Sequence, residues 1–232
     1  MTLLGLDTSA IACTAALTRD GEVLAAFSRR DGLTHSETLL PGIEELFRQR
    51  GMTEKDLDAI AVSAGPGSFT GLRIGISTVK GLAYAADLPC IPVSTREALA
   101  ENAVSREGAL VCAVMDARRG EFYNALFRVK NGVTERLTPD RAVTGKALAE
   151  ELTGQEKLVL LGDGAEKFGN LFPDFAEYLA PEKERFQSGV SVCRVGERLW
   201  IQGGAGSCRT IAPRYLRLPQ AEREWIAKQK TK

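Results

Sequence analysis

The segment from Ala64 to Gly81, AGPGSFTGLRIGISTVKG, constrains the fold of this 232-residue chain more than any other. It follows an apolar run, Leu57–Ser63, that is typical of a buried strand, and it continues into a helical pattern. A strand, a glycine-rich turn and a helix start form a phosphate cradle, because free backbone N–H groups and the helix dipole point at the turn. The P-loop spacing is absent, since no Lys-Ser or Lys-Thr pair follows the glycines and Lys80 lies far down the helix. The segment therefore predicts the scaffold of a phosphotransfer enzyme without its usual phosphate ligands.

The overall charge argues against an independent nucleic-acid-binding protein. The chain has 30 basic and 30 acidic side chains, so it lacks the basic surplus with which such proteins displace counterions. No apolar stretch approaches the roughly 20 residues of a membrane span, and the first residues do not resemble a signal peptide. The five cysteines are scattered, and none forms a C-x-x-C pair. We therefore expect a cytoplasmic protein with reduced thiols and no membrane partner.

The first half of the chain predicts three strands followed by a helix. The strands are Leu3–Asp7, Cys13–Thr18 and Val23–Phe27, with Asp20-Gly21 as a hairpin turn. Thr34 and Glu37 then form a capping box, and the helix that it begins ends at Gly51. Pro41 predicts either a kink in this helix or a start later than Thr34.

The second half repeats this order. Strands are predicted at Leu110–Met115, Phe122–Val129 and Val133–Leu137, and Asp116 closes the first of them as Asp7 does in the first half. A helix, a strand and the turn Gly162-Asp163-Gly164 follow. The repetition predicts an α/β fold of the actin-like ATPase and sugar-kinase type, in which two RNase H-like lobes arise by duplication. We assign residues 1–105 to the first lobe, and residues 106–232 to a second, reduced lobe that includes the C-terminal tail.

Asp7 and Asp116 are candidate cofactor-binding residues. In this type of fold, two such carboxylates face Mg²⁺ and a nucleotide across a cleft, because a hard divalent cation needs oxygen ligands beside phosphates. The alternative is that each carboxylate accepts hydrogen bonds from its own turn, which Thr8 and Ser9 favour after Asp7. With the two glycine-rich turns, these residues support an ATPase or small-molecule kinase as an alternative function.

His35 is the only histidine in the chain. It argues against a histidine-based metal site, since one imidazole cannot supply two ligands. A peptidase that uses a serine and His35 is a further alternative, but no G-x-S-x-G elbow is present. The pattern favours a structural role at the start of a helix, or a place at an interface.

The helix that begins near Ser68 carries small residues at a spacing that permits close helix contact. Gly71 and Gly75 stand four residues apart, and each glycine costs up to about 1 kcal/mol relative to alanine within a helix. The offsetting contact is either a partner protein or another part of the same chain. Phe69, Arg73 and the glycine edge are the residues that we expect to face another helix.

Five segments together resemble the TsaB (YeaZ) family of bacterial tRNA threonylcarbamoyladenosine biosynthesis proteins. In family order they are LGLDTSAIACTAAL, THSETLLPGIEELF, AGPGSFTGLRIGISTVKGLAYA, MDARRGEFYNALF and PRYLRLPQAE, and they span nearly the whole chain. The resemblance implies an actin-like fold and a non-catalytic paralogue of the transferase TsaD. That transferase carries a His-x-x-x-His metal pair, whereas Thr95 and Leu99 occupy the matching positions here. Neither residue binds a transition metal as imidazole does, so the resemblance implies no metal, no cofactor and no catalytic residue.

The resemblance further implies a platform that pairs with a TsaD-like transferase and a TsaE-like ATPase, forms a homodimer when alone, and meets tRNA only within the complex. The matching partner-binding helices are Thr34–Arg50 and Ser68–Ala86. The residues that we expect at this interface are His35, Leu39, Ile43, Phe69, Leu72, Arg73, Ile76 and Val79.

Overall fold

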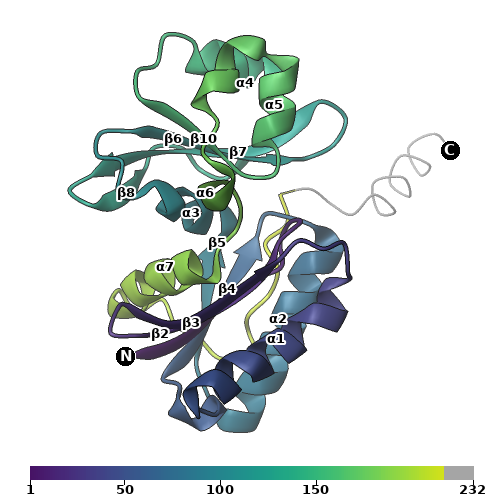
Figure 1. Ribbon diagram of the computed structural model, residues 1–232, viewed down its shortest axis with the longest axis vertical. Coiled ribbons are helices and arrows are strands. Elements are labelled where there is room, and N and C mark those ends of the chain that lie inside the picture. The colour runs from purple at the N-terminus through teal and green to yellow at the C-terminus, as the bar shows by residue number, and fades with distance from the viewer. Residues whose placement is uncertain (217–232) are drawn as a thin grey trace, which may run out of the picture.

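The computed structural model describes residues 1–216 and contains two lobes, each built on a five-stranded mixed sheet (Figure 1). The strands are β1 (Thr2–Asp7), β2 (Cys13–Arg19), β3 (Glu22–Arg29), β4 (Ala59–Gly65), β5 (Cys90–Ser94), β6 (Leu110–Asp116), β7 (Glu121–Lys130), β8 (Val133–Arg136), β9 (Arg141–Thr144) and β10 (Leu158–Leu161). The α-helices are α1 (His35–Arg50), α2 (Phe69–Ala86), α3 (Thr95–Ala100), α4 (Gly145–Leu152), α5 (Ala165–Leu171), α6 (Glu182–Arg185) and α7 (Gly189–Ile201). Short 3-10 helices cover Glu54–Asp56 (η1), Glu101–Ala103 (η2) and Pro173–Tyr178 (η3).

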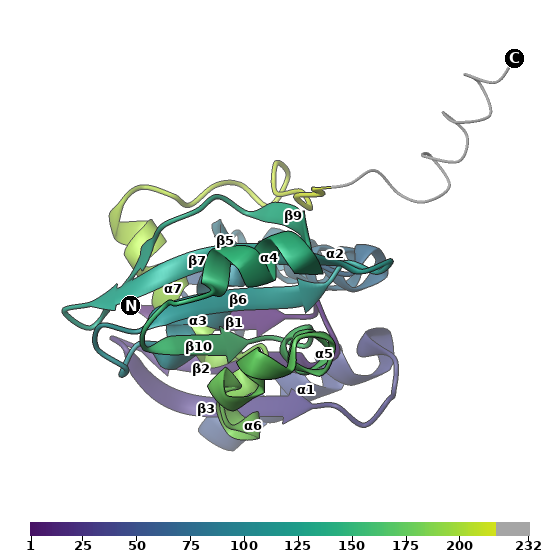
Figure 2. The same ribbon diagram turned by 90° about the horizontal axis from the view of Figure 1, so that it is seen from above.

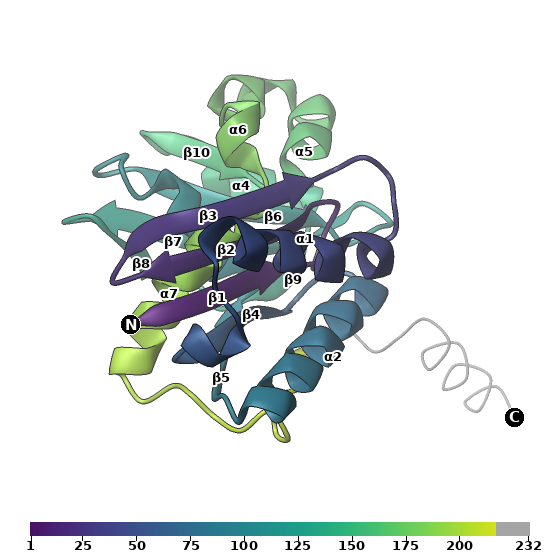
Figure 3. The same ribbon diagram turned by 60° about the horizontal axis from the view of Figure 1, so that its bottom comes forward.

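The first sheet has the strand order β3-β2-β1-β4-β5. The strands β1, β2 and β3 are antiparallel, whereas β4 and β5 continue the sheet in parallel with β1. Side chains alternate between the two faces of β1, as strand geometry requires. Leu4 and Leu6 pack in the core beneath α1 and α2, while Leu3 packs with Val192 of α7 on the other face. Figure 3 shows α1 and α2 side by side along their face of the sheet.

Helix α1 begins directly after Thr34, as the capping box predicts. The backbone N–H of Thr34 donates to the Glu37 carboxylate at 3.2 Å, which satisfies a donor at the helix start. The helix continues through Pro41 to Arg50. Pro41 therefore lies inside the helix, which starts at His35 with Thr34 as its N-cap.

The second sheet repeats the order of the first as β8-β7-β6-β10, and β9 adds to β7. The strands β6, β7 and β8 are antiparallel, and β10 is parallel to β6. No described strand follows β10 where β5 follows β4 in the first sheet, so the second lobe is reduced. Figure 2 shows α4 and α5 over this sheet, where Leu148 and Phe168 enter its core. The repeated strand order confirms the predicted duplicated fold of the actin-like ATPase and sugar-kinase type.

The predicted lobe boundary needs a correction at its C-terminal side. Helix α7 packs on β1 and β2 of the first sheet, where Val192, Cys193 and Val195 are buried (Figure 1). The chain after α7 also stays with the first lobe, because Gly206 pairs with Cys90 of β5. Residues 189–216 therefore belong to the first lobe. The reason is physical: α7 supplies the apolar cover for the face of the first sheet that α1 and α2 leave open.

The tail motif PRYLRLPQAE is described only as far as Leu216, and Arg217 and the residues after it lie outside the described residues. Between residues 1 and 216, none of the helices has the length and the apolar character needed to cross a bilayer.

Candidate functional site

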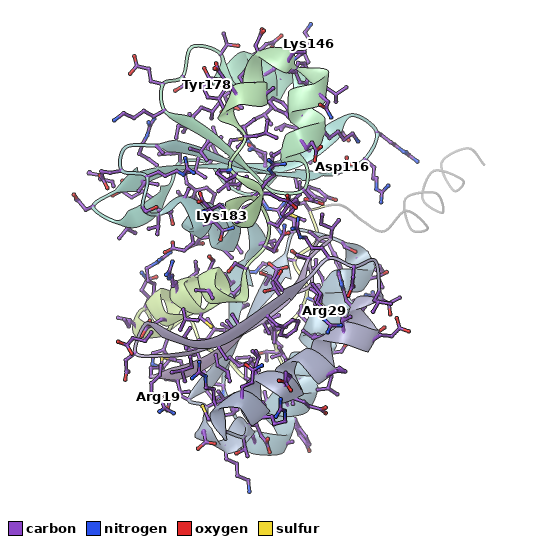
Figure 4. The ribbon with its side chains drawn as sticks, viewed as in Figure 1. Arg19, Arg29, Asp116, Lys146, Tyr178 and Lys183 are labelled. Carbon is purple, nitrogen blue, oxygen red and sulfur yellow. The ribbon has the colours of Figure 1, made fainter. Side chains whose placement is uncertain are left out.

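A cleft of about 460 Å³ lies between the lobes. Four turns line it: the β1–β2 turn, the glycine-rich turn before α2, the β6–β7 turn and the β10–α5 turn that carries Asp163. Strands β1 and β6 are equivalent strands of the two sheets. The turns that follow them both line this cleft. Figure 4 labels Asp116 at the edge of the upper lobe, beside the junction. The cleft is the place where a nucleotide and Mg²⁺ would have to bind if the chain were a kinase.

Asp7 does not offer a free carboxylate to this cleft. It is fully buried, and its Oδ1 accepts hydrogen bonds from the backbone N–H of Ser9 at 2.7 Å and from the Ser9 hydroxyl at 2.6 Å. Its Oδ2 accepts from the Ser63 hydroxyl. Burial raises the pKa of Asp7, although these hydrogen bonds act in the opposite direction. Asp7 therefore joins β1, its own turn and β4, which is the structural role that Thr8 and Ser9 indicated.

Asp116 lines the cleft but is paired within its own lobe. Lys167 of α5 donates to both of its carboxylate oxygens at 2.9 Å, and the backbone N–H of Arg118 donates to Oδ1 at 2.8 Å. Partial burial raises the pKa of Asp116, but the contacts with Lys167 and Arg118 outweigh it, so the pKa is lowered overall. A cation that bound Asp116 would have to displace Lys167.

The Lys167–Asp116 pair makes a testable contribution to stability. Because the folded-state pKa of Asp116 is lowered, the pair stabilises the protein above the unfolded pKa of 3.8, and this contribution is lost as the pH falls through the folded value. We expect Lys167→Met to lose up to about 1 kcal/mol at pH 7 and nothing once Asp116 is protonated. Urea unfolding at pH 7 and at a series of decreasing pH values below 3.8 measures this difference. Lys146→Met on α4 is the control: it removes only a 3.9 Å ion pair between the exposed side chains of Lys146 and Glu150, so its effect should stay below about 0.5 kcal/mol at every pH.

The described residues contain no group of three or more histidine, cysteine, aspartate or glutamate side chains placed to hold a metal ion. Thr95 and Leu99, for which the resemblance implied the loss of metal-binding histidines, are both buried in α3. Leu99 packs in the apolar core of the second lobe. These positions therefore serve packing in this chain.

His35 is half-buried, and its Nε2 lies 2.7 Å from the carbonyl oxygen of Ala10. The imidazole thus connects the start of α1 to the β1–β2 turn. Within the described residues no hydrogen bond joins His35 to a serine hydroxyl, so the peptidase alternative gains no support from the geometry. The contact fits a structural role at the helix start, and the place of His35 at an interface stays a prediction.

The structure corrects five of the eight predicted interface residues. Their side chains are at most 4% exposed; four of them lie in the core beneath α1 and α2, whereas Leu72 is buried against Gly65 at the end of β4. They are Leu39, Ile43, Leu72, Ile76 and Val79. An amphipathic helix must bury its apolar face, and here the first sheet covers that face. These side chains hold α1 and α2 in place and do not reach a partner's surface.

The glycine edge of α2 also faces inward. A Cβ atom added to Gly71 would lie 2.0 Å from the carbonyl oxygen of Thr8, and one added to Gly75 would lie 2.5 Å from the Thr8 hydroxyl. The Thr8 hydroxyl donates to the Gly71 carbonyl at 2.7 Å. The close contact that offsets the cost of these glycines is therefore with Thr8, which directly follows β1 of the same chain. The expectation that this edge faces another helix is wrong.

The exposed side of α1 and α2 carries a different set of residues, which we call the outer helical face. On α2 it consists of Phe69, Thr70, Arg73, Ser77, Gly81, Tyr84 and Ala85, and on α1 of Leu40, Pro41 and Glu44. Leu40 is 44% exposed and Tyr84 69% exposed, so this face presents some apolar surface. Of this set, the sequence predicted only Phe69 and Arg73 as interface residues. Small and polar residues that lie between apolar ones give no periodic hydrophobic pattern that would mark an interface.

Phe69 and Arg73 are packed against the C-terminal segment. The Phe69 ring stacks on Tyr215 with centroids 5.0 Å apart, and the Arg73 guanidinium lies 4.0 Å above the Phe69 ring. Arg73 Nε donates to the Tyr215 hydroxyl at 3.0 Å. The C-terminal segment thus forms one border of the outer helical face.

Known proteins match this chain over most of its length. The curated protein of Bacillus subtilis called "tRNA threonylcarbamoyladenosine biosynthesis protein TsaB" is 33% identical over 99% of this chain and 100% of its own length. This chain belongs to the TsaB family. The Escherichia coli member of the TsaB family is 32% identical over 94% of this chain and 95% of its own length.

The family model for TsaD, described as tRNA N6-adenosine threonylcarbamoyltransferase, matches residues 31–177. Among solved structures, YeaZ from Pseudomonas aeruginosa aligns with a TM-score of 0.76 and 29% identity, and the alignment covers 93% of this chain and 99% of that one. TsaB-family likeness therefore extends across both lobes, and the TsaD-like region includes α1 and α2.

Proposed function

We propose that this chain is a non-catalytic subunit that docks a TsaD-like transferase through its outer helical face, within tRNA threonylcarbamoyladenosine biosynthesis. Membership of the TsaB family supports the pathway, since the relatives in Bacillus subtilis and Escherichia coli are named for this biosynthesis. Beyond the pathway, the proposal names the partner, the docking surface and the lack of a catalytic role.

The observation that carries the proposal is the match of the TsaD model to residues 31–177 of this chain. Because the matched residues include α1 and α2, we expect a protein described by that model to carry counterparts of both helices. Two such helix pairs can pack face to face, because ridges of side chains on one pair fit grooves on the other. Small residues such as Ser77, Gly81 and Ala85 allow the helix axes to approach closely, and Leu40 and Tyr84 supply apolar area.

The state of the cleft supports the non-catalytic part. Asp7 is engaged with Ser9 and Ser63, and Asp116 with Lys167. Neither carboxylate is free to hold a magnesium ion, and the histidine positions of the transferase carry Thr95 and Leu99. The chemistry then belongs to the transferase, and this chain stabilises the arrangement in which the transferase works.

Further partners follow from the same proposal. A TsaE-like ATPase joins the pair, tRNA meets the chain only within this assembly, and two copies of the chain pair through the outer helical face when the transferase is absent. The division of labour between lobes is part of the proposal too: residues 1–105 with residues 189–216 bind the partner, and residues 106–188 form the second lobe.

Co-purification tests the docking. The full chain, immobilised through a tag, is mixed with the TsaD-like transferase of the same organism, and the expected result is a stoichiometric complex that survives gel filtration. Isothermal titration of the chain alone with Mg-ATP tests the alternative. Micromolar binding would favour an ATPase or kinase, and failure to capture the transferase would contradict the docking proposal.

A further inference from the structure

The chain after α7 forms a strap along the edge of the first sheet, which we define as residues 203–216. Figure 3 shows this segment leaving α7 and passing β5 toward the C-terminal end of α2. The backbone N–H groups of Cys90 and Gly206 each donate to the other residue's carbonyl oxygen at 2.8 Å. Farther along, the N–H of Arg214 donates to the carbonyl oxygen of Ala64 at 2.6 Å. The strap is therefore bonded to the sheet at two points, with residues 207–213 between them.

Two cysteines lie on the same face of the ribbon that β5 and the strap form. Gly206 is directly opposite Cys90 in antiparallel pairing, so Cys208 is the diagonal neighbour of Cys90. Cys90 is buried in the core beneath α2, and Cys208 is partly buried against the same core. Gly206 leaves space beside Cys90, because a Cβ atom there would meet only the Thr210 hydroxyl oxygen, at 3.8 Å. Both thiols are free.

A disulfide between these thiols requires only a small movement of the strap. Diagonal neighbours in an antiparallel ribbon lie about 7–8 Å apart, and a disulfide joins Cα atoms about 4.4–6.8 Å apart. Cys208 lies in a turn whose described hydrogen bonds all fall within residues 207–211. A hollow of about 410 Å³, lined by residues of β5 and of the strap, adjoins this turn. The turn can therefore approach β5 by about 1 Å without breaking a described bond to the sheet.

We propose that Cys90 and Cys208 form a reversible disulfide, which fastens the strap to β5 when the protein is exposed to a peroxide. The structure described above is the reduced form. Tyr215, near the end of the same strap, stacks on Phe69 of α2. Fastening the strap therefore also restrains the segment that borders the outer helical face. The inference does not depend on the proposed docking function.

The difference in burial between the two thiols sets the order of the steps. Burial raises the pKa of the Cys90 thiol to about 11, with the charge of Cys208 acting in the same direction and that of Lys80 in the opposite direction. Cys90 is therefore protonated at neutral pH and enclosed, whereas Cys208 is the more exposed of the two. Since thiolate character and exposure govern oxidation, Cys208 reacts first.

The proposed reaction consumes one hydrogen peroxide. The Cys208 thiolate takes one oxygen atom from the peroxide, which leaves as hydroxide, and becomes a sulfenic acid. The Cys90 sulfur then attacks the Cys208 sulfur, so that the S–S bond forms and the S–O bond breaks. The oxygen leaves as water with the proton of Cys90. In total, two thiols are oxidised to a disulfide and the peroxide is reduced to water.

Peptide mapping after mild oxidation tests the disulfide. The full-length chain, reduced and then freed of reductant, is treated with hydrogen peroxide, and the remaining thiols are alkylated. Trypsin cleaves after lysine and arginine, so Cys90 falls in the peptide 81–96 and Cys208 in the peptide 199–209. We expect these two peptides to be joined in most molecules and the mass of the monomer to fall by about 2 Da, because two hydrogen atoms leave. Dithiothreitol should separate the peptides again.

The matched control moves the thiol of the strap by one residue. The Ser207→Cys/Cys208→Ser variant keeps the number of cysteines, but its new thiol belongs to the other face of the ribbon, so it should give no joined peptides. Cys208→Ser alone should give none either, and both changes are at residues that are not buried. Separate peptides in the natural chain, with added oxygen on Cys208, would overturn the proposal. Linkage of Cys208 to a second copy of the chain, or equal linkage in the control variant, would overturn it as well.

Discussion

We expect the Ser77→Arg variant to bind the TsaD-like transferase about 100-fold more weakly than the natural chain, a loss of about 2.7 kcal/mol. Ser77 is exposed at the middle of α2, between the exposed residues Arg73 and Gly81. An arginine there adds a long charged side chain where two helix pairs must approach closely, so the interface either opens or buries an unpaired charge. Titration calorimetry or biolayer interferometry with purified partners measures the change in Kd.

The matched control places the same charge elsewhere on the same lobe. Gln202 lies exposed at the end of α7, which covers the opposite face of the first sheet. Gln202→Arg should leave the Kd within about twofold, since a distant surface substitution has little effect on an interface. Equal weakening by both variants would show that net charge, rather than the outer helical face, governs the interaction.

The second prediction with a large expected effect is a loss of stability at the close contact between α2 and Thr8, which directly follows β1. Gly71→Ala should destabilise the protein by about 3 kcal/mol, because the new Cβ would lie 2.0 Å from the backbone oxygen of Thr8 and neither backbone can yield without moving the sheet or the helix. The penalty should exceed the gain of up to about 1 kcal/mol that alanine brings to a helix. Urea unfolding followed by circular dichroism measures it.

Gly81 provides the control on the same helix. A Cβ atom there meets nothing within 4 Å, so Gly81→Ala should stabilise the protein by about 0.5–1 kcal/mol through helix propensity alone. If Gly71→Ala and Gly81→Ala changed the free energy of unfolding equally, the contact between α2 and Thr8 would not be tight.

The duplicated fold was predictable from the sequence because strand signals and hairpin turns repeat in both halves. The apolar runs of β1 and β6, and the turns after β2 and β7, are local features of the chain. The sheet on which α7 packs was not predictable. The apolar side of a helix indicates that the helix packs against something, but it does not indicate which sheet. Its position far from β1 in the chain suggested the second lobe, yet Val192 and Val195 fill the open side of the first.

The same limitation explains the five misassigned interface residues. The sequence shows that Leu72, Ile76 and Val79 share a face of α2, but a face bound for the protein's own sheet and a face bound for a partner look alike. The exposed side, with Ser77 and Gly81, gives no periodic apolar signal at all. Its assignment needed the burial of each side chain, which depends on the whole fold.

The burial of Arg96 was also not predictable from the sequence. An arginine in the first turn of α3 reads as a surface residue, since arginine is almost never fully buried without a partner. Only the three-dimensional structure shows that its guanidinium is enclosed and that Nη2 donates to the carbonyl oxygen of Pro66.

The central claim is that this chain acts through docking and contributes no catalytic group. The most direct measurement is the initial rate of tRNA threonylcarbamoylation in a reconstituted system, with the transferase, the ATPase and saturating amounts of this chain. We expect the Asp116→Asn/Arg118→Ala double variant, altered at the cleft, to support a rate within about twofold of the natural chain, and omission of the chain to abolish modification. A rate more than about tenfold lower with the saturating double variant, or full activity without the chain, would contradict the claim.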